Sequence, residues 1–584
     1  MTVETQSNKP AGVTAFPEPV SLGQQSAADS KAIRRRSHLP ILLLIGVLGA
    51  SAVLYLFTMG PAAFGFYHDE GIYVSTAKGL ATGQGYRIID LPGEPAETKY
   101  PPFYPFLLSL IWRIYPSFPG NIVPMMLLSI AATIGYFALT YSYLTSQGYA
   151  GRWQALVVVG LAAINWRTLI PATGVSSEMV FALLSVGAMY LAEKPPERSW
   201  LQQCAASVML GTSIGLAILT RSSGVALLIS IAAYYAMIRQ WRRALLPVAI
   251  GGVFLVAWLG WCYMNRTMAE GVNTPYYTSY LGHLRETVED LSAANQTSAV
   301  VTMLGIVARN VFMLVIASVP VVCLGVGYES LVYLGFTFLF FAAGFWRQVS
   351  RGLRLLPVYV VCYLGIHFFW LPFGSYDRFL MPLLPFLLLF LLIEIEAVSA
   401  LVKTELAARD RVKRLSAAVI ALAMVGLVGI VVYNYSLDVY RSISLGSFTK
   451  PTGPLADDRE AIGWIKANTD ISDVLLCYRD PLYFLYTGRK ATRFFPMKAG
   501  TTWRRNQPLI FDIVAQNRAR YLIITASDFE TDYEPELERQ SFRSLVDGHP
   551  EMFTAAFQAA DGRSTIYRIA NNAGAAASTS VQRD

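Results

Sequence analysis

The chain has 584 residues, of which 54% are hydrophobic and only 15% are charged, and its mean hydropathy is +0.42. So few charges are unusual in a soluble domain, whereas a protein that crosses the membrane many times has this composition. The net charge is +8, but the basic residues lie in short clusters between apolar runs. Such clusters are typical of topology signals and lipid-headgroup contacts and argue against a nucleic-acid-binding surface.

The sequence predicts a polytopic α-helical membrane protein with about eleven transmembrane helices. Residues 1–33 are polar and rich in Ser, Gln, Pro and Ala, which predicts a disordered cytoplasmic N-terminus. Three arginines precede the first apolar run, which is too long for a signal peptide and predicts an uncleaved anchor. Apolar runs of spanning length lie at 39–59, 122–144, 152–170, 176–192, 203–220, 222–238, 244–264, 328–345, 355–373, 378–400 and 413–433.

Basic clusters in alternate loops set the predicted topology. The clusters that follow the second, fourth, sixth, eighth and tenth runs fall on one side of the membrane if eleven segments cross it. The apolar segment 299–325 would break this alternation as a span, so we expect it to be interfacial or re-entrant. An odd number of spans places the C-terminus on the outer face.

The C-terminal part of the chain is more charged and follows a different pattern. We expect a transmembrane domain over 34–434, an extracytoplasmic α/β domain over 435–571 and a flexible tail over 572–584. The α/β domain is predicted from strand-like runs at 473–478 and 520–525, helical patterns at 458–468 and 509–517, and a hairpin of 552–559 and 565–569 turned at Asp561-Gly562.

The first external loop, 60–121, is long for a connector, and long loops in compact proteins are often functional. Near its start, Asp69 and Glu70 open a helix-like stretch that is broken by two glycines. Near its end, the segment Lys99-Tyr100-Pro101-Pro102 is stiff, because proline fixes φ and the residue before proline favours extended geometry. Ionisable groups at a membrane boundary are costly, which favours a functional role for this loop.

Two carboxylates and nearby cations could carry out group transfer to a hydroxyl. A carboxylate beside an apolar wall, such as Asp69, can take the proton of an acceptor hydroxyl as a general base. A leaving lipid phosphate needs cations for its developing charge, and Lys99, Arg221 and Arg378 could supply them. The alternatives are that the acidic pair stabilises a helix N-terminus and that Lys99 extends toward lipid headgroups.

Three of the charged candidates stand at outer helix ends. Arg221 lies in a tight turn on the outer face, where a lone arginine runs against the positive-inside bias; ordinary turn anchoring is the alternative. Arg378 opens the tenth run and could instead pair with Asp377. Glu178 opens the fourth run, where it could face the same cavity as Asp69 or lie in a first turn behind a serine cap.

The sequence contains no metal-binding signature. His68, His283 and His367 lack a His/Glu spacing typical of a metal site, and the five cysteines form no CxxC pair. Outer tyrosines such as Tyr67 and Tyr73 could stack on sugar rings, although anchoring at the membrane interface accounts for most of them.

Taken together, these residues resemble those of the GT-C superfamily of membrane glycosyltransferases, in the branch of the protein mannosyltransferases and the lipid A aminoarabinose transferase. The resemblance covers most of the chain, and it rests on the order and topological placement of several weak motifs. These motifs are Asp69-Glu70, Lys99 before Pro101-Pro102, Ser177-Glu178, Thr220-Arg221, Arg378-Phe379 with Pro382 and Pro385, and Tyr486-Thr487-Gly488-Arg489.

The resemblance implies an inverting enzyme that moves a sugar from a polyprenyl-monophosphate donor to an acceptor on the outer face. Asp69 matches the catalytic acidic position and would activate the acceptor hydroxyl, while Glu70 would position the loop or contact the acceptor. Glu178 matches a second acidic position that is often Asp in relatives, so its role as base, sugar contact or structural residue stays open.

The cations would hold the lipid phosphate by the same resemblance. They are Lys99, Arg221 and Arg378, with His68 and Tyr100 as further substrate-binding candidates. Metal use varies within the superfamily, so no cofactor is predicted and a divalent cation stays open.

A transporter or flippase of lipid-linked saccharides is the alternative function. Such proteins usually carry paired repeats with interrupted helices, which we do not find in the sequence, and a non-enzymatic scaffold has no need of the charged first loop. The expected partners are the lipid-linked sugar, membrane lipids, and a glycan, lipid or protein acceptor, but no nucleic acid. The family branch favours a bacterial inner membrane.

Overall fold

The computed structural model describes residues 27–60, 64–65, 67–195, 199–266, 277–325, 331–371, 376–407, 410–444, 454–494, 503–525, 528, 535–560, 562 and 564–570. The predicted tail at 572–584, residue Asp561 of the predicted turn and most of the predicted disordered N-terminus lie outside these residues. The first helix begins at Ala27, so 27–33 extends that helix instead of belonging to a disordered segment. Three alanines in this stretch favour helix.

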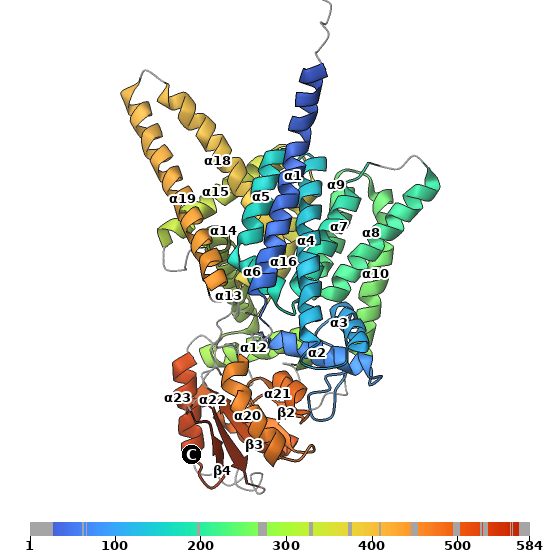
Figure 1. Ribbon diagram of the computed structural model, residues 1–584, viewed down its shortest axis with the longest axis vertical. Coiled ribbons are helices and arrows are strands. Elements are labelled where there is room, and N and C mark those ends of the chain that lie inside the picture. The colour runs from blue at the N-terminus through green and yellow to red at the C-terminus, as the bar shows by residue number, and fades with distance from the viewer. Residues whose placement is uncertain are drawn as a thin grey trace, which may run out of the picture.

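A bundle of helices forms the larger part of the molecule (Figure 1). Helices occupy all eleven predicted spans. The bundle and its loops contain α1 (Ala27–Thr58), α2 (His68–Ala81), α3 (Phe103–Ile114), α4 (Ile122–Ser146), α5 (Arg152–Ile164), α6 (Trp166–Thr173), α7 (Ser177–Ala192), α8 (Trp200–Thr220), α9 (Val225–Met237), α10 (Trp241–Met264), α12 (Tyr280–Asn295), α13 (Ala299–Val311), α14 (Val319–Leu324), α15 (Leu331–Ser350), α16 (Leu355–Phe368), α17 (Tyr376–Phe379), α18 (Leu384–Leu406) and α19 (Arg411–Ser444).

The predicted count of eleven spans is not confirmed. In the described part of the chain, seven helices are long and apolar enough to cross a membrane, or eight if α5 and α6 together make one span. The predicted spans at 176–192, 222–238 and 355–373 form shorter apolar helices. The pair α5 and α6 is bent by 63°, because Asn165 is extended between them and its side chain accepts a hydrogen bond from the amide of Arg167.

The segment 299–325 differs from its predicted state. Residues Ala299–Leu324 form one continuous helical run of 26 residues, with a π-helical stretch at Phe312–Ser318, and this run is long and apolar enough to span. This favours a further span over the interfacial or re-entrant segment that the charge alternation predicts. The positive-inside rule considers only the charges in the loops, so it gives no information on whether an apolar segment is long enough to span the membrane.

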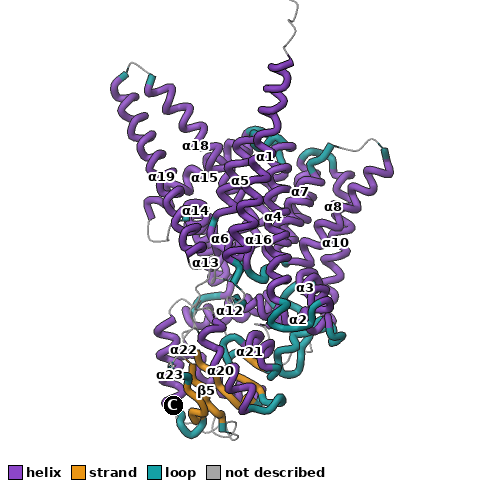
Figure 2. Tube along the Cα trace, in the orientation of Figure 1, coloured by secondary structure: helices purple, strands orange, loops and turns teal. Residues whose placement is uncertain are grey.

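The C-terminal domain is a small α/β unit, the part that carries the strands in Figure 2. Its sheet has the order β2-β1-β3-β5-β4, in which β1 is parallel to β2 and β3, and β5 is antiparallel to β3 and β4. The predicted strands, hairpin and helices are confirmed. The elements are α20 (Pro454–Asn468), β1 (Val474–Leu476), α21 (Asp480–Thr487), β2 (Ala491–Thr492), α22 (Trp503–Asn517), β3 (Ala519–Thr525), α23 (Pro535–Asp547), β4 (Phe553–Gln558) and β5 (Ser564–Ile569).

Apolar side chains cover both faces of this sheet. Successive residues of β3 point to opposite faces, so Leu522 packs with α22 and α23 while Ile523 packs with α20. The strand is therefore buried on both sides, which explains why it reads as an almost continuous apolar run.

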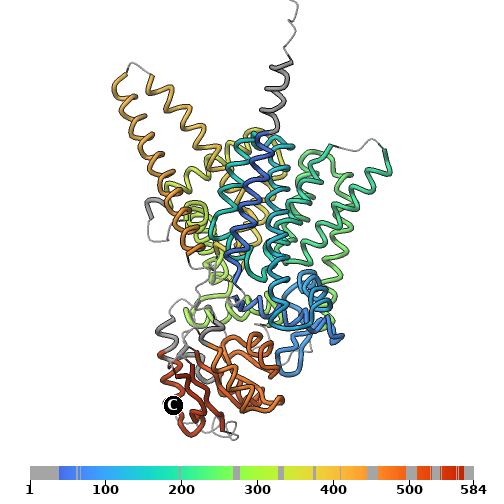
Figure 3. The backbone as a smooth tube through the Cα atoms, in the orientation of Figure 1, coloured from blue at the N-terminus to red at the C-terminus, as the bar shows by residue number. Residues whose placement is uncertain are grey.

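The loop that follows α1 and the C-terminal domain lie at the same end of the bundle (Figures 1 and 3), and the start of α1 lies at the opposite end (Figure 1). Helix α2 ends at Ala81, and the chain then turns at Gly83 and Gly85, the two glycines that were predicted to break it, whose φ angles are +79° and +85°. Beyond the stiff segment, α3 begins directly after Pro102.

Candidate active site

A cluster of four charged side chains lies where several helices end near the C-terminal domain. Glu178 comes from the first turn of α7, Arg221 follows α8, Arg378 lies in α17, and Asp69 lies in the first turn of α2. Arg221 Nη1 is 3.0 Å from Glu178 Oε1, and Arg378 Nε donates to the same oxygen. Arg378 Nη2 is also 3.0 Å from Asp69 Oδ2, so this arginine bridges the two carboxylates.

The two carboxylates of the cluster differ in their exposure to solvent. The Glu178 side chain is only 1% exposed and its carboxylate contacts two guanidinium groups. The Asp69 side chain is 23% exposed and pairs with Arg378. Buried charges require such partners, because desolvation is costly. Asp69 is therefore the carboxylate that a substrate can reach more easily.

Hydroxyl groups complete the surroundings of Glu178. Ser176 occupies the N-cap position of α7, yet its hydroxyl donates to the Glu178 carboxylate instead of accepting from the helix amides. Arg221 Nη1 donates to Ser177 Oγ at 3.0 Å, and the same oxygen is 3.0 Å from Tyr73 Oη. The serine cap that was the alternative explanation of this segment is thus replaced by a contact to the acidic side chain.

Glu70 lies apart from the cluster and connects two backbone segments. Its Oε2 accepts from the amide of Gly65 at 2.9 Å, and its Oε1 accepts from the amide of Val175 at 3.2 Å. Burial raises the pKa of Glu70 to about 8, although these amide donors oppose the shift. A Cβ on Gly174 would lie 2.5 Å from Glu70 Oε1, so a side chain at this position would force the Glu70 carboxylate to shift.

Lys99 is buried near Asp69 and does not extend along the surface. The residue is 7% exposed, and its Nζ lies 5.2 Å from the ring centre of Tyr280 and 5.6 Å from that of Tyr100. Burial lowers the pKa of Lys99 to about 8, although the nearby carboxylates of Asp69 and Glu97 oppose the shift. The alternative in which Lys99 extends toward lipid headgroups does not fit this burial.

Glu97 orders the segment that carries Lys99. Its Oε1 accepts from the amide of Lys99 at 2.7 Å and from that of Tyr100 at 2.9 Å. The Tyr100 ring packs edge-on against Tyr73, 5.3 Å between ring centres. Tyr100 therefore connects the stiff segment to α2.

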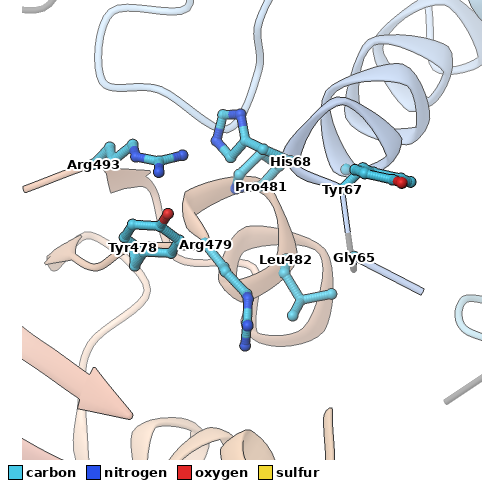
Figure 4. Close-up of a pocket in the computed structure, with 9 residues that line it drawn as sticks. Gly65, Tyr67, His68, Tyr478, Arg479, Pro481, Leu482 and Arg493 are labelled. Atoms are coloured by element: carbon cyan, nitrogen blue, oxygen red, sulfur yellow. The ribbon is translucent and has the colours of Figure 1, made fainter. Parts of the chain in front are cut away.

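His68 faces the C-terminal domain. Its Nε2 is 2.6 Å from Asp480 Oδ1, and it lines a pocket between the start of α2 and that domain. Figure 4 shows the pocket, whose lining includes Tyr67, His68, Arg479, Pro481 and Arg493. Arg378 lies 4.2 Å from the ring centre of Tyr67, so Tyr67 adjoins both the pocket and the charged cluster.

Sequence reasoning found most of the cluster and missed several of its neighbours. The structure brings together Asp69, Glu178, Arg221 and Arg378, with Lys99 and Tyr100 beside them, whereas Glu70 and His68 make contacts outside the cluster. The expected alternative pair of Asp377 with Arg378 is wrong, because Asp377 pairs with Arg167. The missed residues Arg167, Tyr277, Tyr280 and Asp480 belong to no local motif, so no signal in the sequence pointed to them.

The other two candidate histidines, His283 and His367, are buried. His367 lies against the rings of Tyr363 and Phe379, with ring centres 4.5 and 4.9 Å away, and His283 is buried in α12. Within the described residues, no three His, Cys, Asp or Glu side chains come together as a group that could hold a metal ion.

Comparison with known proteins gives matches among solved structures. No family model and no curated protein matches the chain. The oligosaccharyltransferase of Archaeoglobus fulgidus, tethered with an acceptor peptide, aligns over 90% of this chain and 74% of its own, with a TM-score of 0.52 and 13% identity. The archaeal AglB in complex with an inhibitory peptide and a dolichol-phosphate aligns over the same shares, with a TM-score of 0.51.

ArnT from Cupriavidus metallidurans bound to undecaprenyl phosphate also aligns, over 90% of this chain and 97% of its own, with a TM-score of 0.47 and 12% identity. The matches to the Archaeoglobus fulgidus oligosaccharyltransferase show that this chain shares the fold of that enzyme, which confirms the fold class that the sequence predicted. With its long apolar helices, it is an integral membrane protein.

Proposed function

We propose that the protein is an inverting glycosyltransferase that uses a polyprenyl-monophosphate sugar as donor. The observation that carries this proposal is the division of roles between the two carboxylates of the cluster. Glu178 is buried and bound by two arginines, while Asp69 is more exposed and stands at the edge of the same cluster. One carboxylate is thus available to a substrate beside a fixed pair of cations.

In the proposed reaction, Asp69 acts as the general base. The acceptor oxygen forms a bond to the anomeric carbon, the bond from that carbon to the phosphate oxygen breaks, and its electron pair leaves with the lipid phosphate. Asp69 takes the proton of the acceptor hydroxyl. The acceptor approaches the face opposite the leaving group, so the anomeric configuration inverts.

Arg221, Arg378 and Lys99 stabilise the leaving phosphate. Guanidinium groups fixed by a carboxylate are preorganised, so they need little rearrangement as negative charge develops. Glu178 acts here as the residue that holds both arginines in place. The likeness in fold to AglB, whose solved complex contains a dolichol-phosphate, supports a lipid phosphate as the leaving group.

The reaction takes place on the outer face of a bacterial inner membrane, with a cell-envelope glycan, a lipid or a protein as the acceptor. The first loop and the C-terminal domain lie at one end of the bundle (Figure 1), and Asp69 of the charged cluster lies in the first turn of α2 within that loop. This common placement supports an arrangement in which the donor enters from the membrane and the acceptor arrives from the side of the C-terminal domain.

The proposal is tested with purified protein in nanodiscs and a panel of polyprenyl-phosphate sugars. We expect the wild type to release free polyprenyl phosphate from one donor, and Asp69→Asn to release none. Arg568→Gln removes a charge from an exposed position on β5 and is expected to behave like the wild type. Movement of a labelled donor between leaflets without release of polyprenyl phosphate would instead identify a flippase.

A further inference from the structure

Helix α21 belongs to the C-terminal domain in sequence but packs into the membrane domain. Its side chains Leu482, Phe484 and Leu485 belong to the same apolar cluster as residues of α2, α4 and α7. Figure 1 shows α21 beside α2. The C-terminal domain is therefore docked on the first external loop through a buried apolar contact.

Two glycines allow this helix to approach the start of α2 closely. A Cβ on Gly71 would lie 2.7 Å from Pro481 Cβ, and a Cβ on Gly65 would lie 3.0 Å from Leu482 Cδ1. Gly65 also has a φ of +88°, a conformation that favours glycine. Figure 4 shows Leu482 directed toward Gly65 and Pro481 beside His68. The backbone on both sides of Asp69 is thus in contact with α21.

A buried carboxylate forms the polar part of the same contact. Asp480 is fully buried; its Oδ1 is 2.6 Å from His68 Nε2, and its Oδ2 accepts from the Tyr277 hydroxyl at 2.9 Å. The Tyr277 oxygen in turn accepts from the amide of Arg493 at 3.1 Å. A carboxylate requires donors, so the proton of the imidazole lies on Nε2, which fixes the ring orientation.

This contact acts directly on the first turn of α2. His68 is the first residue of that helix and Asp69 is the second. Asp69 is held from one side by Arg378 at 3.0 Å, and its backbone is held from the other side through His68. Any shift of His68 moves the carboxylate next to it.

We propose that Asp480 is a positioning residue for the reaction, through which the C-terminal domain holds His68 and thereby sets the place of the Asp69 carboxylate. This inference rests on the proposed function, in which Asp69 is the base. A misplacement of a reacting group by about 1 Å can cost roughly 100-fold in rate. Asp480→Ala is therefore expected to lower kcat by about 100-fold, while the KM for the donor stays within about twofold of the wild type.

The test combines kinetics with a readout that needs no turnover. Release of polyprenyl phosphate is measured for Asp480→Ala, His68→Ala and the double variant, using the donor that the wild type accepts. Because the two residues act through one contact, the double variant is expected to be no slower than the slower single variant. Asp480→Asn keeps an oxygen that accepts from the imidazole and is expected to recover most of kcat. Asp473→Ala, which removes a carboxylate bonded within its own turn, is the matched control.

Hydrogen exchange measured by mass spectrometry on the nanodisc-embedded protein reports the geometry itself. Peptides covering 65–75 are expected to exchange faster in Asp480→Ala and at the wild-type rate in Asp473→Ala. Three results would overturn the inference. Asp480→Ala could show the kcat and the exchange of the wild type, or the effects of the two single variants could add in the double variant. The control Asp473→Ala could also change kcat and exchange as much as Asp480→Ala does. If Asp480→Ala does not fold, hydrogen exchange of the same peptides in His68→Ala tests the inference instead. If the wild type uses no donor, the proposed function fails, while the exchange experiment still decides the positioning.

Discussion

Replacing Glu178 should affect stability, whereas replacing Asp69 should affect catalysis. Glu178 is 1% exposed and accepts from Arg221, Arg378 and Ser176. Glu178→Gln leaves two guanidinium charges with the single carboxylate of Asp69, and it turns an amide NH₂ toward groups that are donors. Breaking a buried ion pair in this way costs about 3–5 kcal/mol. We therefore expect Glu178→Gln to lower the stability of the membrane domain by about this amount.

Asp69 gives a matched comparison within the same cluster. Its side chain is 23% exposed and pairs with Arg378, which keeps Glu178 as a partner after the change. Pairs with solvent access contribute about 0–1 kcal/mol, so Asp69→Asn is expected to keep its stability while losing donor turnover.

The assay follows thermal unfolding of both variants in the same detergent by tryptophan fluorescence, together with release of polyprenyl phosphate in nanodiscs. A clearly lower midpoint for Glu178→Gln and an unchanged midpoint for Asp69→Asn are expected. A Glu178→Gln protein that is as stable as the wild type but inactive would refute the structural role of Glu178 and make it a second catalytic carboxylate.

Further predictions concern Lys99, Arg378 and Gly174. Lys99 has a lowered pKa of about 8, so it is charged below that pH and neutral above it. The KM for the donor should therefore rise as the pH passes 8. Lys99→Arg should remove this rise, because a guanidinium stays charged. Arg378→Lys cannot bridge Asp69 and Glu178 with a planar fork and should lower donor turnover at least about tenfold, a loss of about 1.4 kcal/mol, measured as kcat/KM. Gly174→Ala places a Cβ 2.5 Å from Glu70 Oε1 and should destabilise by about 1–3 kcal/mol, seen as a lower thermal midpoint; an unchanged midpoint would contradict the contact.

Several features of this protein follow from its sequence alone. Runs of apolar residues placed all eleven predicted helices, because burial in a membrane leaves few alternatives for such runs. Local signals placed the start and end of α2, where acidic residues open the helix and two glycines end it. The strands of the C-terminal domain followed from short apolar runs and a hairpin pattern. The choice of Asp69, Glu178, Arg221 and Arg378 as one site depended on the predicted topology, which puts all four at helix ends on the same side of the membrane.

Tertiary structure alone decided how those residues pair. Arg378 pairs with Asp69 and Glu178 and not with its neighbour Asp377, because packing of α2, α7 and α17 brings distant side chains closer than adjacent ones. Asp480 contacts His68, from which it is separated by 412 positions in the sequence, and no local sequence pattern predicts this contact. Hydrophobicity and propensity act over a few residues and so determine elements, whereas ion pairs and domain contacts depend on where the folded helices place their ends.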